Sequence, residues 1–249
     1  RAGRTEGMDR WRAVALTIAL ASCVLAACGR DAAEQAYFAA LEQEGAGVPA
    51  RQLIPYVDRA IALAPERAHY WQKRGEYRAA LGELEGAEAD FDRALALREA
   101  PFLRFERGLV RTQRGNLSKA LADFDAAIAA QPANAQFYRG RALARVASGD
   151  ARGGLADAAR LLALSPADGE SLYPRGVARA ALGDLRAALA DFDAVLRRRP
   201  DLIYVLLARA NCLDQLQYVV RARADRAAFA RASSGPDAGC GVCENPLHP

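Results

Sequence analysis

The sequence holds few of the residues on which enzymes most often depend. Its 249 residues include two histidines, and neither a glycine-rich phosphate loop nor a Ser/His/Asp arrangement is apparent, so the catalytic options are thin. Runs of alternating β-branched residues, which predict strands, are also missing. Alanine, leucine, arginine and glutamate are plentiful instead, and these residues favour helix. We therefore expect a helical protein that is not an enzyme and has no catalytic residues.

The chain also lacks an excess of charge of one sign. Its formal net charge is +4. Residues 1–27, which we expect to be removed, hold four of the basic and two of the acidic side chains, so 30 basic and 28 acidic side chains remain. A nearly neutral mature protein gives no electrostatic reason to expect binding to nucleic acid.

A short hydrophobic segment after Met8 has the features of a secretory signal. Arg10 and Arg12 precede a mainly apolar run over 13–25. The run is too short to cross a bilayer, which takes about 20 residues, but it suits the central region of a signal peptide. It ends in Leu-Ala-Ala-Cys at Cys28, which resembles the lipobox of bacterial lipoproteins. The resemblance implies cleavage before Cys28 and acylation of its thiol and new N-terminus; an ordinary cleaved signal or a retained anchor is the alternative.

The lipobox implies that the protein is held at a membrane. Two or three acyl chains, at about 0.8 kcal/mol per buried CH₂, anchor a protein durably, whereas one chain does not. Gly29 is not the Asp that marks inner-membrane retention, so we expect the outer membrane, facing the periplasm. We predict a signal peptide at 1–27, with 1–7 upstream of the start at Met8, and a lipidated linker at 28–33. No cofactor is expected beyond the covalent lipid.

The string ADFD marks a longer internal repeat. It occurs at 89–92, 122–125 and 190–193, so its copies start 33 and 68 residues apart. A unit of about 34 residues fits, with one copy that carries Ala158 in place of Phe. Each unit also has Arg followed by Gly or Ala, a turn residue that is Gly in four copies, and in several copies a closing Pro. This pattern resembles the tetratricopeptide repeat, in which two antiparallel helices recur every 34 residues.

The resemblance implies an all-α solenoid of antiparallel helix pairs that winds into a right-handed superhelix over 34–232. Such an array buries a continuous core between neighbouring repeats. The predicted units are 34–67 (degenerate), 68–100, 101–134, 135–168, 169–202 and the closing helices at 203–232, followed by a disordered tail at 233–249.

The first acid of the repeated string is predicted to form a structural ion pair. In each unit an Arg precedes this Asp by sixteen residues, with the turn residue midway. Residues equidistant from the turn of an antiparallel hairpin lie opposite one another, so the guanidinium should meet the carboxylate. The second acid lies about 200° round the helix, which argues against a shared metal or acid–base site. The predicted pairs are Arg74–Asp90, Arg107–Asp123, Arg141–Asp157, Arg175–Asp191 and Arg209–Asp225.

The resemblance also implies a concave groove, lined by the first helix of each unit, that binds extended or helical segments of partner proteins. The Lys/Asn/Arg cluster with which some members clamp a peptide carboxylate is absent. An apolar floor with aromatic edges is expected instead, and such patches usually mark contact surfaces; the alternative is that several of these side chains pack against neighbouring helices. The predicted groove residues are His69, Phe102, Phe105, Leu109, Arg139, Leu143, Tyr173, Val177 and Tyr204. Use of the convex face and the oligomeric state stay open.

The expected mature chain holds three cysteines besides Cys28, which suggests one disulfide because exported proteins meet oxidising conditions. Cys240 and Cys243 in the tail form one candidate pair, and either of them with Cys212 forms another. A thioredoxin-type motif requires a βαβ setting, and a metal site here lacks a fourth ligand. We therefore expect a membrane-anchored scaffold that binds partner proteins in cell-wall enzyme or pilus and secretin assembly. A redox- or metal-linked function of the tail is the alternative.

Overall fold

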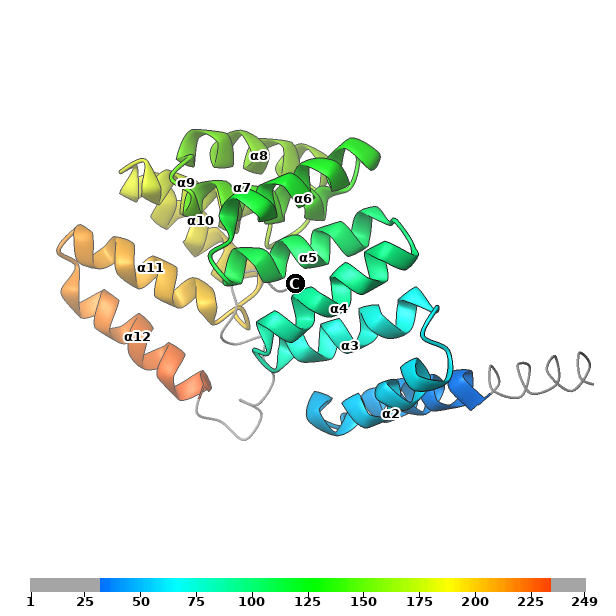
Figure 1. Cartoon of the computed structure of the whole chain (residues 1–249). Coiled ribbons are helices and arrows are strands. Elements are labelled where there is room, and N and C mark those ends of the chain that lie inside the picture. The colour runs from blue at the N-terminus through cyan, green and yellow to red at the C-terminus, as the bar shows by residue number, and fades with distance from the viewer. Residues whose placement is uncertain (1–31, 234–249) are drawn as a thin grey trace, which may run out of the picture.

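The computed structural model describes residues 32–233, and the regular structure of this part is entirely helical. A helix over 32–45 precedes the others, and Figure 1 shows antiparallel pairs stacked side by side into a curved array. None of the described helices is long and apolar enough to cross a membrane. The remaining helices are α2 (Ala50–Leu63), α3 (Ala68–Ala80), α4 (Leu84–Leu97), α5 (Pro101–Gln113), α6 (Leu117–Ala130), α7 (Ala135–Ala147), α8 (Ala151–Leu164), α9 (Leu172–Ala181), α10 (Leu185–Arg198), α11 (Tyr204–Gln215) and α12 (Val219–Ser233).

The helix over 32–45 starts earlier than the sequence predicted. Residues 32 and 33 were assigned to a linker, yet they are helical, and Ala33, Ala36 and Ala40 are buried. Alanines at this spacing form one helix face, and that face packs against α2 and Tyr70 of α3. The predicted linker is therefore too long, and the degenerate first unit is a complete helix pair.

The hairpin turn of each regular unit depends on a residue with positive φ. Gly82, Gly115, Gly149 and Gly183 have φ between 74° and 91°. Glycine adopts this conformation without a steric penalty. Gln217 takes the same place in the last hairpin with a φ of 64°, where a residue with a Cβ atom is destabilised by about 1–2 kcal/mol.

A phenylalanine ring in three units fills the space above a glycine on the facing helix. A Cβ atom added to Gly108 would lie 2.8 Å from the ring of Phe124. The third regular unit, 135–168, has alanine at both places, Ala142 and Ala158, and both are fully buried. The two positions are therefore coupled, because the ring fits only where the facing residue has no side chain. The coupled pairs are Gly75–Phe91, Gly108–Phe124 and Gly176–Phe192.

The two helices of the third regular unit, which lacks this ring, approach each other closely at Gly154. A Cβ atom added to Gly154 of α8 would lie 2.6 Å from Cγ2 of Val146 and 2.9 Å from the carbonyl oxygen of Ala142, both on α7. Gly154 therefore allows α8 to pack against α7 at a distance that a side chain would prevent.

Candidate functional site

Each of the five predicted arginine–aspartate pairs forms a contact with two hydrogen bonds. Nε of Arg107 donates to Asp123 at 2.9 Å and Nη2 donates at 2.6 Å. The paired aspartates are buried, and such bidentate, charge-assisted bonds are stronger than neutral ones. The first acid of the repeated string therefore joins the two helices of its own hairpin. The same geometry recurs in Arg74–Asp90, Arg141–Asp157, Arg175–Asp191 and Arg209–Asp225.

Sequence reasoning missed a second arginine on four of these acids. Arg111 follows Arg107 by one helical turn and donates through Nη1 to Asp123 at 2.7 Å. The signal was present, because Arg recurs four residues after the first Arg in every regular unit except the last, where Leu213 stands. The equivalent bonds, all at 2.8 Å, are Arg78–Asp90, Arg145–Asp157 and Arg179–Asp191.

The second acid of the string joins neighbouring repeats. Asp125 accepts a bond at 2.7 Å from Arg141 of the next unit. Ala159 occupies this position at the joint before Arg175, so that joint lacks the bond. Within residues 32–233, no group of three or more His, Cys, Asp or Glu side chains could hold a metal ion. The string thus has two structural roles. The equivalent bonds, from the first Arg of a unit to an Asp of the preceding unit, are Arg74–Asp58, Arg107–Asp92 and Arg209–Asp193.

The predicted open floor of the groove is mostly closed. The ring centroid of Phe105 lies 5.2 Å from that of Phe137, and Tyr173 and Tyr204 lie 4.9 Å apart. These rings fill the seams between the first helices of successive repeats, so the expectation of aromatic edges free for a partner was too broad. The predicted groove residues that are buried are Phe105, Leu109, Leu143, Tyr173 and Tyr204.

The other four predicted groove residues differ in what they offer. Phe102 is 43% exposed and Val177 is half-buried against its neighbours. Arg139 donates to Glu170 at 2.8 Å and is therefore engaged. The ring of His69 packs 4.3 Å from that of Tyr70, and burial lowers the pKa of its imidazole. Phe102 is accordingly the predicted groove residue best placed to meet a partner.

An apolar cavity of about 60 Å³ opens beside Phe102. A second hollow of about 450 Å³ lies next to it, between the start of α2 and helices α3 and α5. Glu76 and Glu106 line both, so the two form one continuous surface, which we call the N-terminal groove. Its lining includes Glu44, Leu53, Glu76, Tyr77, Ala79, Phe102, Phe105, Glu106, Leu109 and Gln113.

The N-terminal groove carries more acidic than basic side chains. Nε2 of Gln72 donates to Glu76 at 3.0 Å and to Glu106 at 3.2 Å. Lys73 lies 2.7 Å from Glu76 and 3.4 Å from Glu44. Burial, and after it the charge of Glu76, raises the pKa of Glu106 to about 9. Glu106 therefore holds a proton at neutral pH, and a cation beside it would favour release of that proton.

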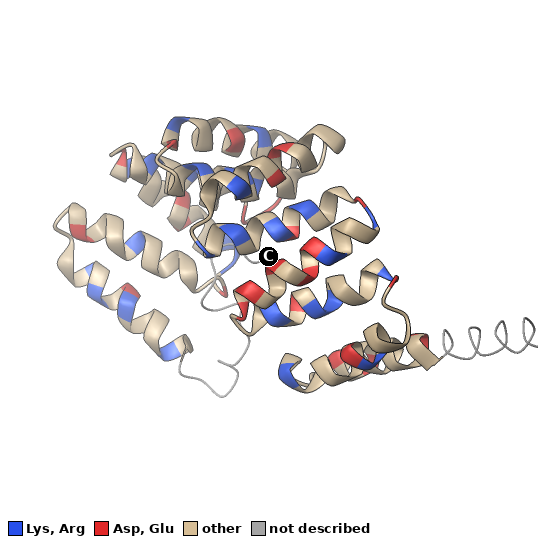
Figure 2. Cartoon of the chain, in the orientation of Figure 1, with Lys and Arg blue, Asp and Glu red and all other residues tan. Residues whose placement is uncertain are grey.

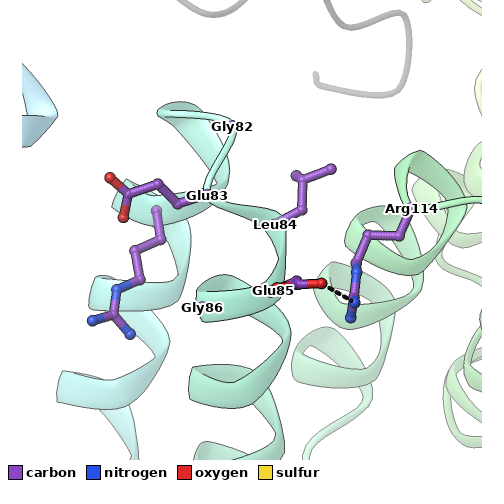
Figure 3. A pocket seen from close by; sticks show the side chains of 7 residues that line it. Gly82, Glu83, Leu84, Glu85, Gly86 and Arg114 are labelled. Carbon is purple, nitrogen blue, oxygen red and sulfur yellow. Dashed lines mark hydrogen bonds and ion pairs between the residues drawn. The ribbon is translucent and has the colours of Figure 1, made fainter.

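A separate hollow at the tip of the α3–α4 hairpin does not form an anion site. Figure 3 shows Arg114 paired with Glu85, at 3.0 Å, and Arg114 also bonds Glu88. Arg78 donates to Asp90 at 2.8 Å. Both guanidinium groups on this hollow are thus already bound to carboxylates. Figure 2 shows the same mixture of signs along α3, α4 and α5, with no face of a single charge there.

Among the cysteines of these predictions, the described residues include Cys212. Cys212 is buried on α11, and burial raises the pKa of its thiol. Cys28, Cys240 and Cys243 lie outside the described residues. The lipid anchor and the three alternative disulfides therefore stay predictions.

Solved structures with a similar fold are helical repeat proteins. PilW, described as a widely conserved type IV pilus biogenesis factor, has a TM-score of 0.68 at 20% identity, over 82% of this chain and 95% of that chain. A tetratricopeptide repeat protein from Parabacteroides merdae ATCC 43184 has a TM-score of 0.66 at 16% identity, over 87% and 86%. MamA from Desulfovibrio magneticus RS-1 has a TM-score of 0.60 at 21% identity, over 69% and 97%.

No protein-family model and no curated protein matches the chain. At the identities given above, the likeness to solved structures shows the fold alone. The helix pairs, the positive-φ turns and these similarities agree with one another. The chain therefore has the fold of a tetratricopeptide repeat solenoid.

Proposed function

We propose that this protein is a membrane-anchored scaffold that holds partner proteins in its N-terminal groove during assembly of the cell envelope. The observation that carries the proposal is the apolar cavity beside the exposed Phe102, flanked by Glu76 and Glu106. Aromatic side chains next to a pocket are typical centres of binding energy. The curved array supports the proposal because such solenoids present extended concave binding surfaces.

The N-terminal groove suits a partner segment that carries an apolar and a cationic side chain close together. The apolar side chain would contact Phe102 and Leu109 at the cavity. A Lys or Arg would lie against Glu76 and Glu106, where Lys73 already pairs with Glu76. Its charge would stabilise the ionised form of Glu106, so binding would release a proton.

The mechanism that we propose is positional. A lipid at Cys28 would hold the scaffold at the outer membrane, facing the periplasm, and would raise the local concentration of its partners there. The candidate pathways are recruitment of cell-wall enzymes and assembly of pilus or secretin machinery. The second of these is named by analogy of fold, because a type IV pilus biogenesis factor has a similar structure.

Cross-linking in cells, followed by pull-down from envelope extracts, tests the groove. The variant is Phe102→Glu, and Tyr56→Glu is a matched control because Tyr56 is 42% exposed on α2 and lines neither hollow of the groove. We expect the Phe102 variant to lose partners that the wild type and the control retain. Recovery of the same partners from all three proteins would overturn the proposed site.

A further inference from the structure

The turn between α11 and α12 carries three consecutive exposed apolar residues. Tyr218 is 48% exposed, Val219 42% and Val220 83%. We call these residues the apolar tip. Figure 1 shows this turn at the left edge of the view, at the last helix pair of the array.

The other hairpin tips are polar where this one is apolar. In register with the turn residue, Tyr218 occupies the place that carries an acid or an amide in the other units. Such side chains suit the start of a helix, and Asp150 and Asp184 do cap α8 and α10. Val219 conforms to the repeat, because an apolar residue stands there in every unit. The residues equivalent to Tyr218 are Glu83, Asn116, Asp150 and Asp184, and those equivalent to Val220 are Glu85, Ser118, Arg152 and Arg186.

The fold does not explain this departure. The buried residues of α12 are Ala222 and Asp225, so Val220 adds little to the core. An apolar group exposed next to others indicates a contact surface rather than a packing need. The apolar tip is therefore a candidate contact surface.

Two arginines lie directly behind the apolar tip. Arg221 adjoins it, and Arg223 stands three residues after Val220, on the same face of the helix. Both side chains are exposed, and neither guanidinium group forms a hydrogen bond or ion pair with another residue of 32–233. The nearby Asp214 and Asp225 are engaged by Arg226 and Arg209. The two cations are thus available to an anionic ligand.

The small size of the apolar tip and its charge indicate the kind of partner. A stable protein interface buries about 800 Å² on each side, which is more than three side chains provide. A bilayer surface demands no shape complementarity, accepts aromatic and aliphatic side chains at its interface and attracts arginine through its anionic headgroups. We infer that the apolar tip docks on a membrane that contains anionic phospholipid, with Arg221 and Arg223 on the headgroup phosphates.

This contact would be a second attachment to a membrane, in addition to the lipid predicted at Cys28. It is weak alone, since few side chains enter the interface. Combined with an anchor on the same chain, it gains from the high effective concentration of lipid. It would fix how the solenoid is oriented on the membrane, whether or not the N-terminal groove binds a partner.

Vesicle co-sedimentation tests the inference. The chain from residue 28 with Cys28→Ser is mixed with phosphatidylcholine vesicles with or without phosphatidylglycerol, so that the acyl anchor does not mask weak binding. We expect binding to the anionic vesicles that weakens with salt. Val220→Asp, and separately Arg221→Glu with Arg223→Glu, should each weaken it about tenfold or more. Tyr56→Asp, an exposed change on another face, should leave binding unchanged.

Two results would overturn the inference. One is equal binding, or no binding, by the wild type and the Val220 variant. The other is self-association, detected by analytical ultracentrifugation and lost in the Val220 variant, because the apolar tip would then contact a second copy of the chain. Circular dichroism of each variant checks the fold, which the exposure of Val220 protects.

Discussion

Replacing Asp123 by Ala should destabilise the protein far more than replacing Asp125, although the two acids belong to the same repeated string and stand only two residues apart on α6. The side chain of Asp123 is 3% exposed and accepts bonds from both Arg107 and Arg111. The side chain of Asp125 is 58% exposed and accepts one bond, from Arg141. The two acids thus differ in burial and in the number of cations that depend on them.

The magnitude follows from what each change leaves behind. Removing one partner of a buried ion pair costs about 3–5 kcal/mol. Arg107 would keep its bond to Asp92 and Arg111 its bond to Glu88, so we expect the lower end, about 3 kcal/mol. Loss of an exposed pair costs about 0–1 kcal/mol, which is the expectation for Asp125→Ala.

Thermal and urea unfolding of the two variants measures the difference. For a protein of this size, 1 kcal/mol corresponds to about 2–4 °C in Tm, so Asp123→Ala should lower Tm by roughly 10 °C and Asp125→Ala by a few degrees at most. Asp123→Asn, which keeps the shape without the charge, should fall between them. Equal losses for the two alanine variants would refute the assignment of a buried role to the first acid and an exposed role to the second.

Two further predictions concern the contact between Gly108 and Phe124 and the protonation of Glu106. Gly108→Ala should lower the free energy of unfolding by about 1–3 kcal/mol because its Cβ meets the ring of Phe124. In the Phe124→Ala background the same change should cost nothing further. If the losses of the two single variants simply add in the double variant, measured by thermal unfolding, the coupling is contradicted. The pKa of Glu106, about 9 in the folded protein and about 4.3 in the unfolded chain, means that this group stabilises the fold fully below pH 4.3 and less as the pH rises to 9. Glu106→Gln should therefore raise stability more at pH 8 than at pH 4 and flatten the dependence of Tm on pH. Parallel pH profiles for the two proteins would be evidence against a protonated Glu106.

The fold and the ion pairs could be predicted because both depend on spacing along the chain. A fixed distance of sixteen residues about a central turn determines which residues face each other, whatever surrounds them. The pairing of Arg209 with Asp225 illustrates this, since it forms although that unit has lost its turn glycine and its phenylalanine. The bond of the second arginine, Arg111 and its equivalents, could have been predicted in the same way, because this arginine follows the first by four residues.

The groove could not be predicted in the same detail. Phe102 and Phe105 are one helical turn apart and both were predicted to line the groove, yet one is exposed and the other buried. Their difference depends on how closely the next repeat approaches, and Phe137 of that repeat closes over Phe105. The distance between neighbouring repeats depends on the volumes of the side chains on both sides of the seam. A periodic sequence pattern does not give that distance.

The joint before Arg175 differs from the other joints in a way that bears on how a bound segment would affect the array. The cross-brace found at the other joints is missing there, because Ala159 replaces the acid. The ion pair between Arg139 and Glu170 spans that joint instead. A charged side chain of a bound segment could pair with either residue in place of the other. A partner segment that paired with Glu170 would compete with Arg139 and would leave the joint to its apolar contacts, which include Leu143 and Tyr173. We therefore expect binding at Glu170 to affect this joint before the four that keep an arginine–aspartate bond.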